Sequence, residues 1–168
     1  VYDHSIVEQL AAMDIEPRDL TYVAFSHLHS DHAGGANAFV ETNVLMQKAE
    51  RESALAGNPE FEPALFEKLK GPAAKLTIID GDYDVFGDDT VRIIFAPGHT
   101  PGHQALLVKL DTTGPILLSG DVYHFRESRT LRRVPKFNFD EGMSLRSMDK
   151  IEALLKETGA TLWIEHDK

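Results

Sequence analysis

The hexapeptide HLHSDH at residues 27–32, followed by two glycines at 34 and 35, constrains this chain more than any other segment. It places three imidazoles and one carboxylate within six residues, and both groups are common ligands of zinc and similar ions. His27 and His29 alternate with Leu28, so both imidazoles can face one point if the segment is extended or turns tightly. Asp31 and His32 can face a second point. One short loop could therefore begin two adjacent metal sites.

Further candidate ligands occur much later in the chain, at His99, Asp121 and His166. Each follows the end of an apolar, strand-like run: residues 91–96, 116–118 and 162–164, respectively. Side chains at strand ends stand on a rigid scaffold and point into loops, where functional residues concentrate. An isolated histidine is more ordinary, so we expect His4 at the surface, and His103 to support His99 or the local turn.

This pattern of histidines and aspartates resembles the metallo-β-lactamase superfamily and, within it, the N-acyl-homoserine lactonases. The resemblance covers residues 21–167. The first motif is specific to the superfamily. The subfamily rests on residues 97–104 (PGHTPGHQ), on the His166-Asp167 ending and on residues 134–141. The resemblance implies an α/β fold of the αβ/βα sandwich type, in which two sheets lie between helical layers.

The resemblance also implies a ligand set for two divalent ions. His27, His29 and His99 would hold the first ion, Asp31, His32 and His166 the second, and Asp121 would bridge the two. Zinc is the metal that we expect, although a site of histidines and carboxylates also accepts cobalt, manganese or iron. A hydroxide bridging the two ions would then attack the substrate carbonyl.

The chain departs from the lactonase pattern next to the bridging aspartate. Lactonases carry a tyrosine three residues after that aspartate, where its hydroxyl can bind substrate, whereas this chain has His124 there and Tyr123 one residue earlier. Either side chain could donate a hydrogen bond to a carbonyl or to a leaving oxygen. We therefore take Tyr123 and His124 as alternative catalytic donors, and Asp31 as the candidate that carries a proton.

The resemblance implies a lactonase that opens the ring of N-acyl-homoserine lactones, which are quorum-sensing signals. Residues 61–69, with Leu65 and Phe66, could form an apolar wall for the acyl tail, although many of them could equally be core. One alternative is a thioester hydrolase similar to glyoxalase II, which shares the first motif and the turn at residues 98–100. A second alternative is a metal-binding fragment without catalytic activity.

Composition limits the partners and the compartment. The net charge of −10 argues against a nucleic-acid ligand, because such binding depends on cationic contacts to phosphate. The chain has no cysteine, which excludes disulfides and cysteine-ligated zinc. No run of about 18 apolar residues indicates a membrane span. No signal peptide is visible, which favours the cytoplasm over the periplasm. Related lactonases are often dimers, and the oligomeric state is left open here.

The length of 168 residues fits one domain. The resemblance implies that residues 1–168 form a single metallo-β-lactamase-like domain, and that this domain is part of a longer enzyme with further N-terminal strands. The basic residues between Arg126 and Lys136 are expected in a solvated loop. The longest predicted helix spans residues 140–158 and carries a buried apolar stripe. The other predicted helices span residues 5–13, 48–56 and 63–70, and the predicted strands span residues 22–25, 44–46, 76–79, 83–86, 91–96, 105–110, 116–118 and 162–164.

Overall fold

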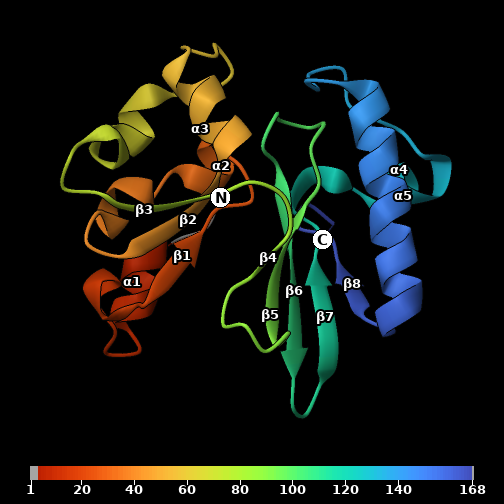
Figure 1. The fold of residues 1–168 in the computed structure, drawn as a ribbon, viewed down its shortest axis with the longest axis horizontal. Helices are drawn as coiled ribbons and strands as arrows, with labels where there is room; N and C mark the ends of the chain where they lie inside the picture. Colours follow the sequence, from red (N-terminus) through yellow and green to blue (C-terminus); the bar gives the residue numbers. More distant parts are fainter. Residues whose placement is uncertain (1–3, 168) are drawn as a thin grey trace. The chain divides into compact units, whose positions relative to one another are not determined.

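The computed structural model describes residues 4–167 (Figure 1). The chain divides into two compact units. Unit 1 comprises Val1–Met46 and Arg51–Ile78, and unit 2 comprises Gln47–Glu50 and Ile79–Lys168. Each unit has its own sheet, and each sheet is accompanied by helices, so the predicted α/β class is confirmed.

Unit 1 is built on a three-stranded sheet in the order β1-β2-β3, in which β1 and β2 run parallel with Val23 opposite Val44. The strands are β1 (Tyr22–Ala24), β2 (Asn43–Gln47) and β3 (Lys75–Ile79). The helices are α1 (Ile6–Ala11), α2 (Ser30–Ala33) and α3 (Lys48–Leu55), and the 3₁₀ segments are η1 (Pro17–Asp19), η2 (Ala36–Phe39) and η3 (Pro63–Lys70). The first three residues of α3 belong to unit 2.

Apolar side chains from the sheet and the helices form the core of unit 1. Val44 and Met46 from β2 pack in one cluster with Phe39 and Phe66. Leu28 belongs to the same cluster, with only 1% of its surface exposed. Because Leu28 is anchored in the core, its two histidine neighbours are held at a fixed place at the start of the metal-binding motif.

Unit 2 is built on a five-stranded sheet in the order β4-β5-β6-β7-β8. The strands β4 to β7 form an antiparallel meander, whereas β8 runs parallel to β7. The parallel pairing requires a crossover, which α4 and α5 supply. The bounds are β4 (Tyr83–Asp84), β5 (Val91–Phe95), β6 (Gln104–Leu110), β7 (Gly114–Leu118), η4 (Gly120–Val122), α4 (Arg126–Leu131), α5 (Glu141–Thr158) and β8 (Thr161–Trp163).

The long helix α5 covers one face of the unit 2 sheet, and Figure 1 shows it running alongside the strands. The Asp140 side chain caps its first turn by accepting a hydrogen bond from the amide of Met143. Gly159 ends the helix in the left-handed conformation, at φ 67°. Ile151 is fully buried in a cluster with Leu117. The helix predicted over residues 140–158 is therefore confirmed, together with its apolar stripe.

Three local predictions were wrong. Residues 63–70 form 3₁₀ turns rather than one regular helix, because the backbone breaks at Phe66, at φ −128°. The strand predicted at 83–86 stops at Asp84, whose carboxylate accepts hydrogen bonds from the amides of the following turn. The basic segment expected as a loop begins with helix α4. None of the helices in residues 4–167 has the length and apolar character needed to cross a membrane.

Candidate metal centre

The first group of predicted ligands lies in unit 1, in the loop that follows β1 and in α2. His27 is buried, and its Nε2 atom lies 3.0 Å from Nδ1 of His29. The two rings meet edge to face, with centroids 4.5 Å apart. The ring of Phe61 packs against His29 at 5.8 Å. Two imidazole nitrogens at this separation can bind one ion, because zinc holds nitrogen ligands at about 2.0–2.1 Å.

Ser26 lies between two of these histidines and was missed in the sequence. Its Oγ atom lies 3.1 Å from Nδ1 of His27 and 3.0 Å from Nδ1 of His32. A hydroxyl can donate to one ring and accept from the other, so one side chain orients two imidazoles. Partners of this kind fix the ring and the tautomer of metal-binding histidines. The signal in the sequence that could have indicated Ser26 is a small polar residue directly before the histidine motif at residues 27–32.

Asp31 and His32 lie on α2, where they form a close pair. Oδ2 of Asp31 is 3.6 Å from Nε2 of His32, and 59% of the Asp31 side chain is exposed whereas only 4% of the His32 side chain is. The pairing agrees with the prediction that these two neighbours face a common point. The exposure of Asp31 allows it to exchange protons with solvent.

The second group lies in unit 2 and centres on the buried carboxylate of Asp121. Oδ2 of Asp121 is 3.3 Å from Nε2 of His99 and 3.1 Å from Nε2 of His124. Oδ1 is 3.3 Å from Nε2 of His166. Each carboxylate oxygen therefore faces its own imidazole partners. Asp121 was predicted as the bridging ligand, and this stays a prediction.

The turn that carries His99 is fixed by the residues that lead into α5. The amide of Phe139 donates to the carbonyl of His99 at 3.1 Å, and the amide of Asp140 donates to the carbonyl of Gly98 at 2.9 Å. Gly98 has φ 137°, and a Cβ atom there would overlap the backbone nitrogen of Ser144. Only glycine therefore fits at this position.

His103 and Glu50 support the same turn without being predicted ligands. Nδ1 of His103 is 3.1 Å from the carbonyl of Ala96, and its Nε2 accepts a hydrogen bond from the amide of Asp121 at 2.9 Å. The expectation that His103 supports local structure is therefore confirmed. The buried carboxylate of Glu50 accepts hydrogen bonds from Thr100 and Gly102, both at 2.8 Å. Glu50 was missed, because its helix gives no sequence signal for this distant contact.

The two candidate donors that follow Asp121 lie in different surroundings. The hydroxyl of Tyr123 donates to Glu152 at 2.8 Å, and Arg129 donates two hydrogen bonds to the same carboxylate. Burial, together with the hydrogen bond to Glu152, raises the pKa of Tyr123 well above its usual range. Tyr123 is 1% exposed and belongs to the unit 2 core. His124 instead lies beside Asp121.

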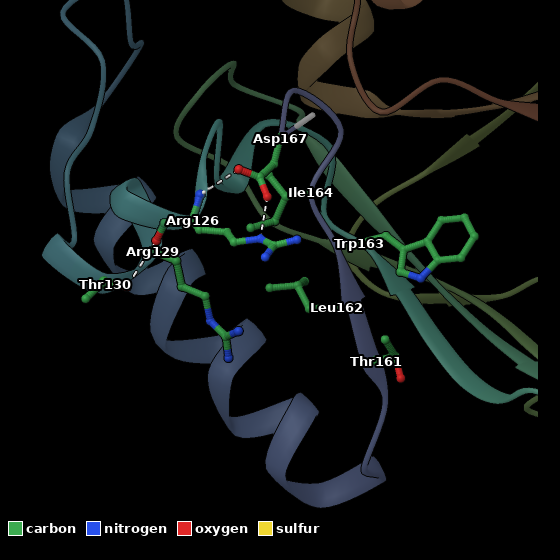
Figure 2. A pocket seen from close by; sticks show the side chains of 8 residues that line it. All are labelled: Arg126, Arg129, Thr130, Thr161, Leu162, Trp163, Ile164 and Asp167. Atoms are coloured by element: carbon green, nitrogen blue, oxygen red, sulfur yellow. Dashed lines mark hydrogen bonds and ion pairs between the residues drawn. The ribbon is translucent and has the colours of Figure 1, made fainter.

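His166 follows β8 and is held by the contacts of its neighbour Asp167. Nε of Arg126 lies 2.5 Å from Oδ2 of Asp167, and the Arg126 amide lies 3.4 Å from its Oδ1 (Figure 2). These contacts connect the start of α4 to the segment that carries His166. They border a pocket of about 670 Å³ between α4 and β8, lined also by Trp163 and Arg129.

The chemistry of the donor set fits a pair of divalent cations. Within unit 1 the predicted ligands His27, His29, Asp31 and His32 lie together, and within unit 2 the same holds for His99, Asp121 and His166. Neutral imidazoles and carboxylates suit zinc and its neighbours in the first transition row. The apolar wall predicted at residues 61–69 is largely core, because Phe61, Phe66 and Leu69 are buried in unit 1.

A comparison with known families gives a match over residues 3–158 to the metallo-beta-lactamase superfamily. The chain belongs to this superfamily. The match includes six of the seven predicted ligands, and it confirms the family that the histidine and aspartate pattern indicated. The predicted fold is supported by solved structures, one of which superposes on 96% of the chain with a TM-score of 0.86.

Relatives of this chain include N-acyl homoserine lactonases. One from Bacillus sp is 35% identical over 162 residues, which cover 96% of this chain and 62% of that protein. The lactonase AttM of Azorhizobium caulinodans is 33% identical, over 98% of this chain and 65% of its own length. The chain thus spans less than two thirds of the length of these curated relatives.

The solved structure with a TM-score of 0.86 is 34% identical in sequence to this chain, which covers 62% of its length. It is an N-acyl homoserine lactone hydrolase with the product N-hexanoyl-L-homoserine bound at its catalytic metal centre. The dizinc quorum-quenching lactonase AidC shares the fold, with a TM-score of 0.73 at 22% identity over 99% of this chain and 65% of AidC.

Proposed function

We propose that this protein is a metal-dependent hydrolase that opens the lactone ring of N-acyl homoserine lactones. The observation that carries the proposal is the carboxylate of Asp121, which has imidazoles at both of its oxygens. Identity of 33–35% to N-acyl homoserine lactonases over almost the whole chain supports the substrate class. Metallo-beta-lactamases share a fold across several reactions, so the substrate depends on the site rather than on the fold.

The proposed site holds two divalent ions, with zinc as the expected metal. His27, His29 and His99 would hold one ion, Asp31, His32 and His166 would hold the other, and Asp121 would serve both. When bound, the two ions lower the pKa of a shared water toward neutrality and polarise the lactone carbonyl. Water adds to the carbonyl carbon and the ring C–O bond breaks, which yields the N-acyl homoserine.

Asp31 is the proposed proton carrier of this reaction. The attacking water loses a proton, and the ring oxygen gains one as it leaves. The exposed Asp31 carboxylate beside His32 can receive the first proton and return it to the alkoxide or exchange it with solvent. Of the two predicted donors, His124 has its side chain beside Asp121, whereas the hydroxyl of Tyr123 is bound to Glu152.

The test is a rate comparison on the zinc-loaded protein. N-hexanoyl homoserine lactone and S-lactoylglutathione are supplied in parallel, and the release of acid or thiol is followed. We expect lactone hydrolysis that is lost in an Asp121→Ala variant and retained in His4→Ala, which removes an exposed imidazole. Faster cleavage of the thioester than of any lactone, or two bound ions with no lactone hydrolysis, would overturn the proposal.

A further inference from the structure

The imidazoles of His124 and His99 lie beside the same carboxylate oxygen of Asp121. Its Nε2 atom lies 3.1 Å from Oδ2 of Asp121, and Nε2 of His99 lies 3.3 Å from the same oxygen. The three side chains offer ligand atoms that all lie within 4.8 Å of one another. All three residues belong to unit 2, so this arrangement is internal to one compact unit.

The separations match those of ligands around one ion. Zinc binds imidazole nitrogen at about 2.0–2.1 Å and carboxylate oxygen at about 2.0–2.2 Å, so two ligands of a tetrahedral ion lie about 3.3 Å apart. The distances from Asp121 Oδ2 to the two histidine nitrogens agree with this value. All three ligand atoms lie within 4.8 Å of one another, which places them within reach of a single ion.

The packing around His124 keeps its ring directed at Asp121. The ring stacks on His166, with centroids 5.6 Å apart and planes 12° from parallel, and it meets His99 edge to face at 5.1 Å. Phe137 covers it from a further side at 5.8 Å. Only 14% of the His124 side chain is exposed. A ring restrained on three sides loses little conformational freedom when its nitrogen binds an ion.

We propose that His124 is an additional ligand of the ion held by His99, bound on the Oδ2 side of Asp121. This inference rests on the metal binding of the proposed function. It gives that ion three ligands from unit 2 alone, namely His99, Asp121 and His124. It also assigns the His124 imidazole to the metal rather than to a hydrogen bond with the substrate.

The test compares His124→Ala and His124→Gln with the unchanged protein. Glutamine keeps an N–H group that can donate to Asp121, but its amide is a poor zinc ligand. Zinc affinity is measured by competition with a chromophoric chelator, and the cobalt-substituted proteins are compared by their visible d–d absorption, which reports the number of ligands. His4→Ala is the matched control, because it removes an exposed imidazole elsewhere.

We expect both His124 variants to lose at least about tenfold in affinity for one of the two ions, because changes in residues that merely support ligands already cost 10- to 100-fold. The cobalt spectrum should change in both variants and stay the same in His4→Ala. Zinc affinity and a cobalt spectrum equal to those of the unchanged protein, in either variant, would overturn the inference.

The metal measurements also separate this inference from the proposed function. If the unchanged protein binds two ions but opens no lactone, the proposed function fails, whereas a loss of zinc affinity in the His124 variants still supports ligation. If the unchanged protein is an active lactonase and His124→Gln binds zinc normally, the inference alone fails. Circular dichroism confirms that each variant is folded before its affinity is compared.

Discussion

The Nε2 atom of His103 accepts a hydrogen bond from the backbone amide of Asp121 at 2.9 Å, while its Nδ1 faces the carbonyl of Ala96. His103 is fully buried, so replacing it leaves both backbone groups without this partner. We expect His103→Leu to lower the free energy of unfolding by about 1–3 kcal/mol. Urea denaturation measures the change. His4→Ala should stay within about 0.5 kcal/mol, and equal midpoints for the two variants would contradict the prediction.

Gly98 approaches the start of α5 more closely than any side chain would allow. We expect Gly98→Ala to destabilise the protein and to weaken zinc binding, because the added Cβ overlaps the backbone of Ser144 at a positive φ. Gly142→Ala is the matched control within the same unit, since its Cβ would make only ordinary contacts at 3.4 Å. Alanine in that helix should stabilise by roughly 0.5–1 kcal/mol. Thermal melts with and without zinc test both expectations. The melting temperature and its increase on adding zinc should fall in Gly98→Ala, whereas the melting temperature should rise in Gly142→Ala.

Glu152 links Tyr123 and Arg129, and its contribution to stability depends on pH. The hydrogen bonds from Arg129 lower the pKa of Glu152, and the Tyr123 hydroxyl adds to this effect while burial opposes it. A carboxylate whose pKa is lower in the folded state stabilises the protein above its unfolded pKa of about 4.3. That stabilisation is lost as the pH falls through the folded pKa.

We therefore expect Glu152→Gln to destabilise the protein at neutral pH and to converge on the unchanged protein at acid pH. About 40% of the side chain is exposed, so solvent screening limits the ion pair to below about 1 kcal/mol. Urea titrations across this pH range test the prediction. Glu157→Gln, on the exposed face of the same helix, is the control and should show no such convergence. A double-mutant cycle with Tyr123→Phe isolates the hydroxyl contact.

Removal of the metal should lower the melting temperature. An ion that binds the folded protein and not the unfolded chain adds about 2.7 kcal/mol to the free energy of unfolding at a concentration 100 times its Kd. We expect a chelator to lower Tm and added zinc to restore it. The Asp121→Ala variant should respond weakly to both. A chelator that leaves Tm unchanged in the unaltered protein would argue against resident metal.

Phe137 presents an exposed apolar ring beside His99 and His124. Its ring lies 6.1 Å from His99 and 5.8 Å from His124, and 59% of the residue is exposed. We expect it to contact the acyl tail, so Phe137→Ala should raise KM for N-decanoyl homoserine lactone several-fold more than for the N-butanoyl substrate. Burial of a methylene group is worth about 0.8 kcal/mol. Phe86→Ala, which also removes an exposed ring, should raise neither KM.

The sequence predicted the parts of this fold that depend on short-range pattern. The apolar stripe within residues 143–155 and the stop at Gly159 gave helix α5 to within one residue of its observed bounds, Glu141–Thr158. The candidate ligands could be named from the sequence because closely spaced histidines and aspartates stand out in a single chain.

The predictions that failed, and the residues that were missed, depend on contacts between residues that are far apart in the sequence. The break at Phe66 follows from the packing of a buried ring, and helix α4 carries no apolar stripe, so periodicity could detect neither. The hydrogen bonds of Glu50 and Glu152 join residues 50 to 52 and 23 to 29 positions apart. No local signal distinguishes such glutamates from the many at the surface. The choice between Tyr123 and His124 was open for the same reason.

The carboxylate of Asp121 is a flat, stiff group whose two oxygens serve opposite neighbours, with His166 at one and His99 and His124 at the other. Any rotation of the carboxylate that improves the contacts of one oxygen worsens the contacts of the other oxygen. A substitution that shifts His166 should therefore change the contact between Asp121 and His99 without any movement of the main chain. A substitution next to one oxygen of Asp121 is therefore expected to change the contacts of both oxygens.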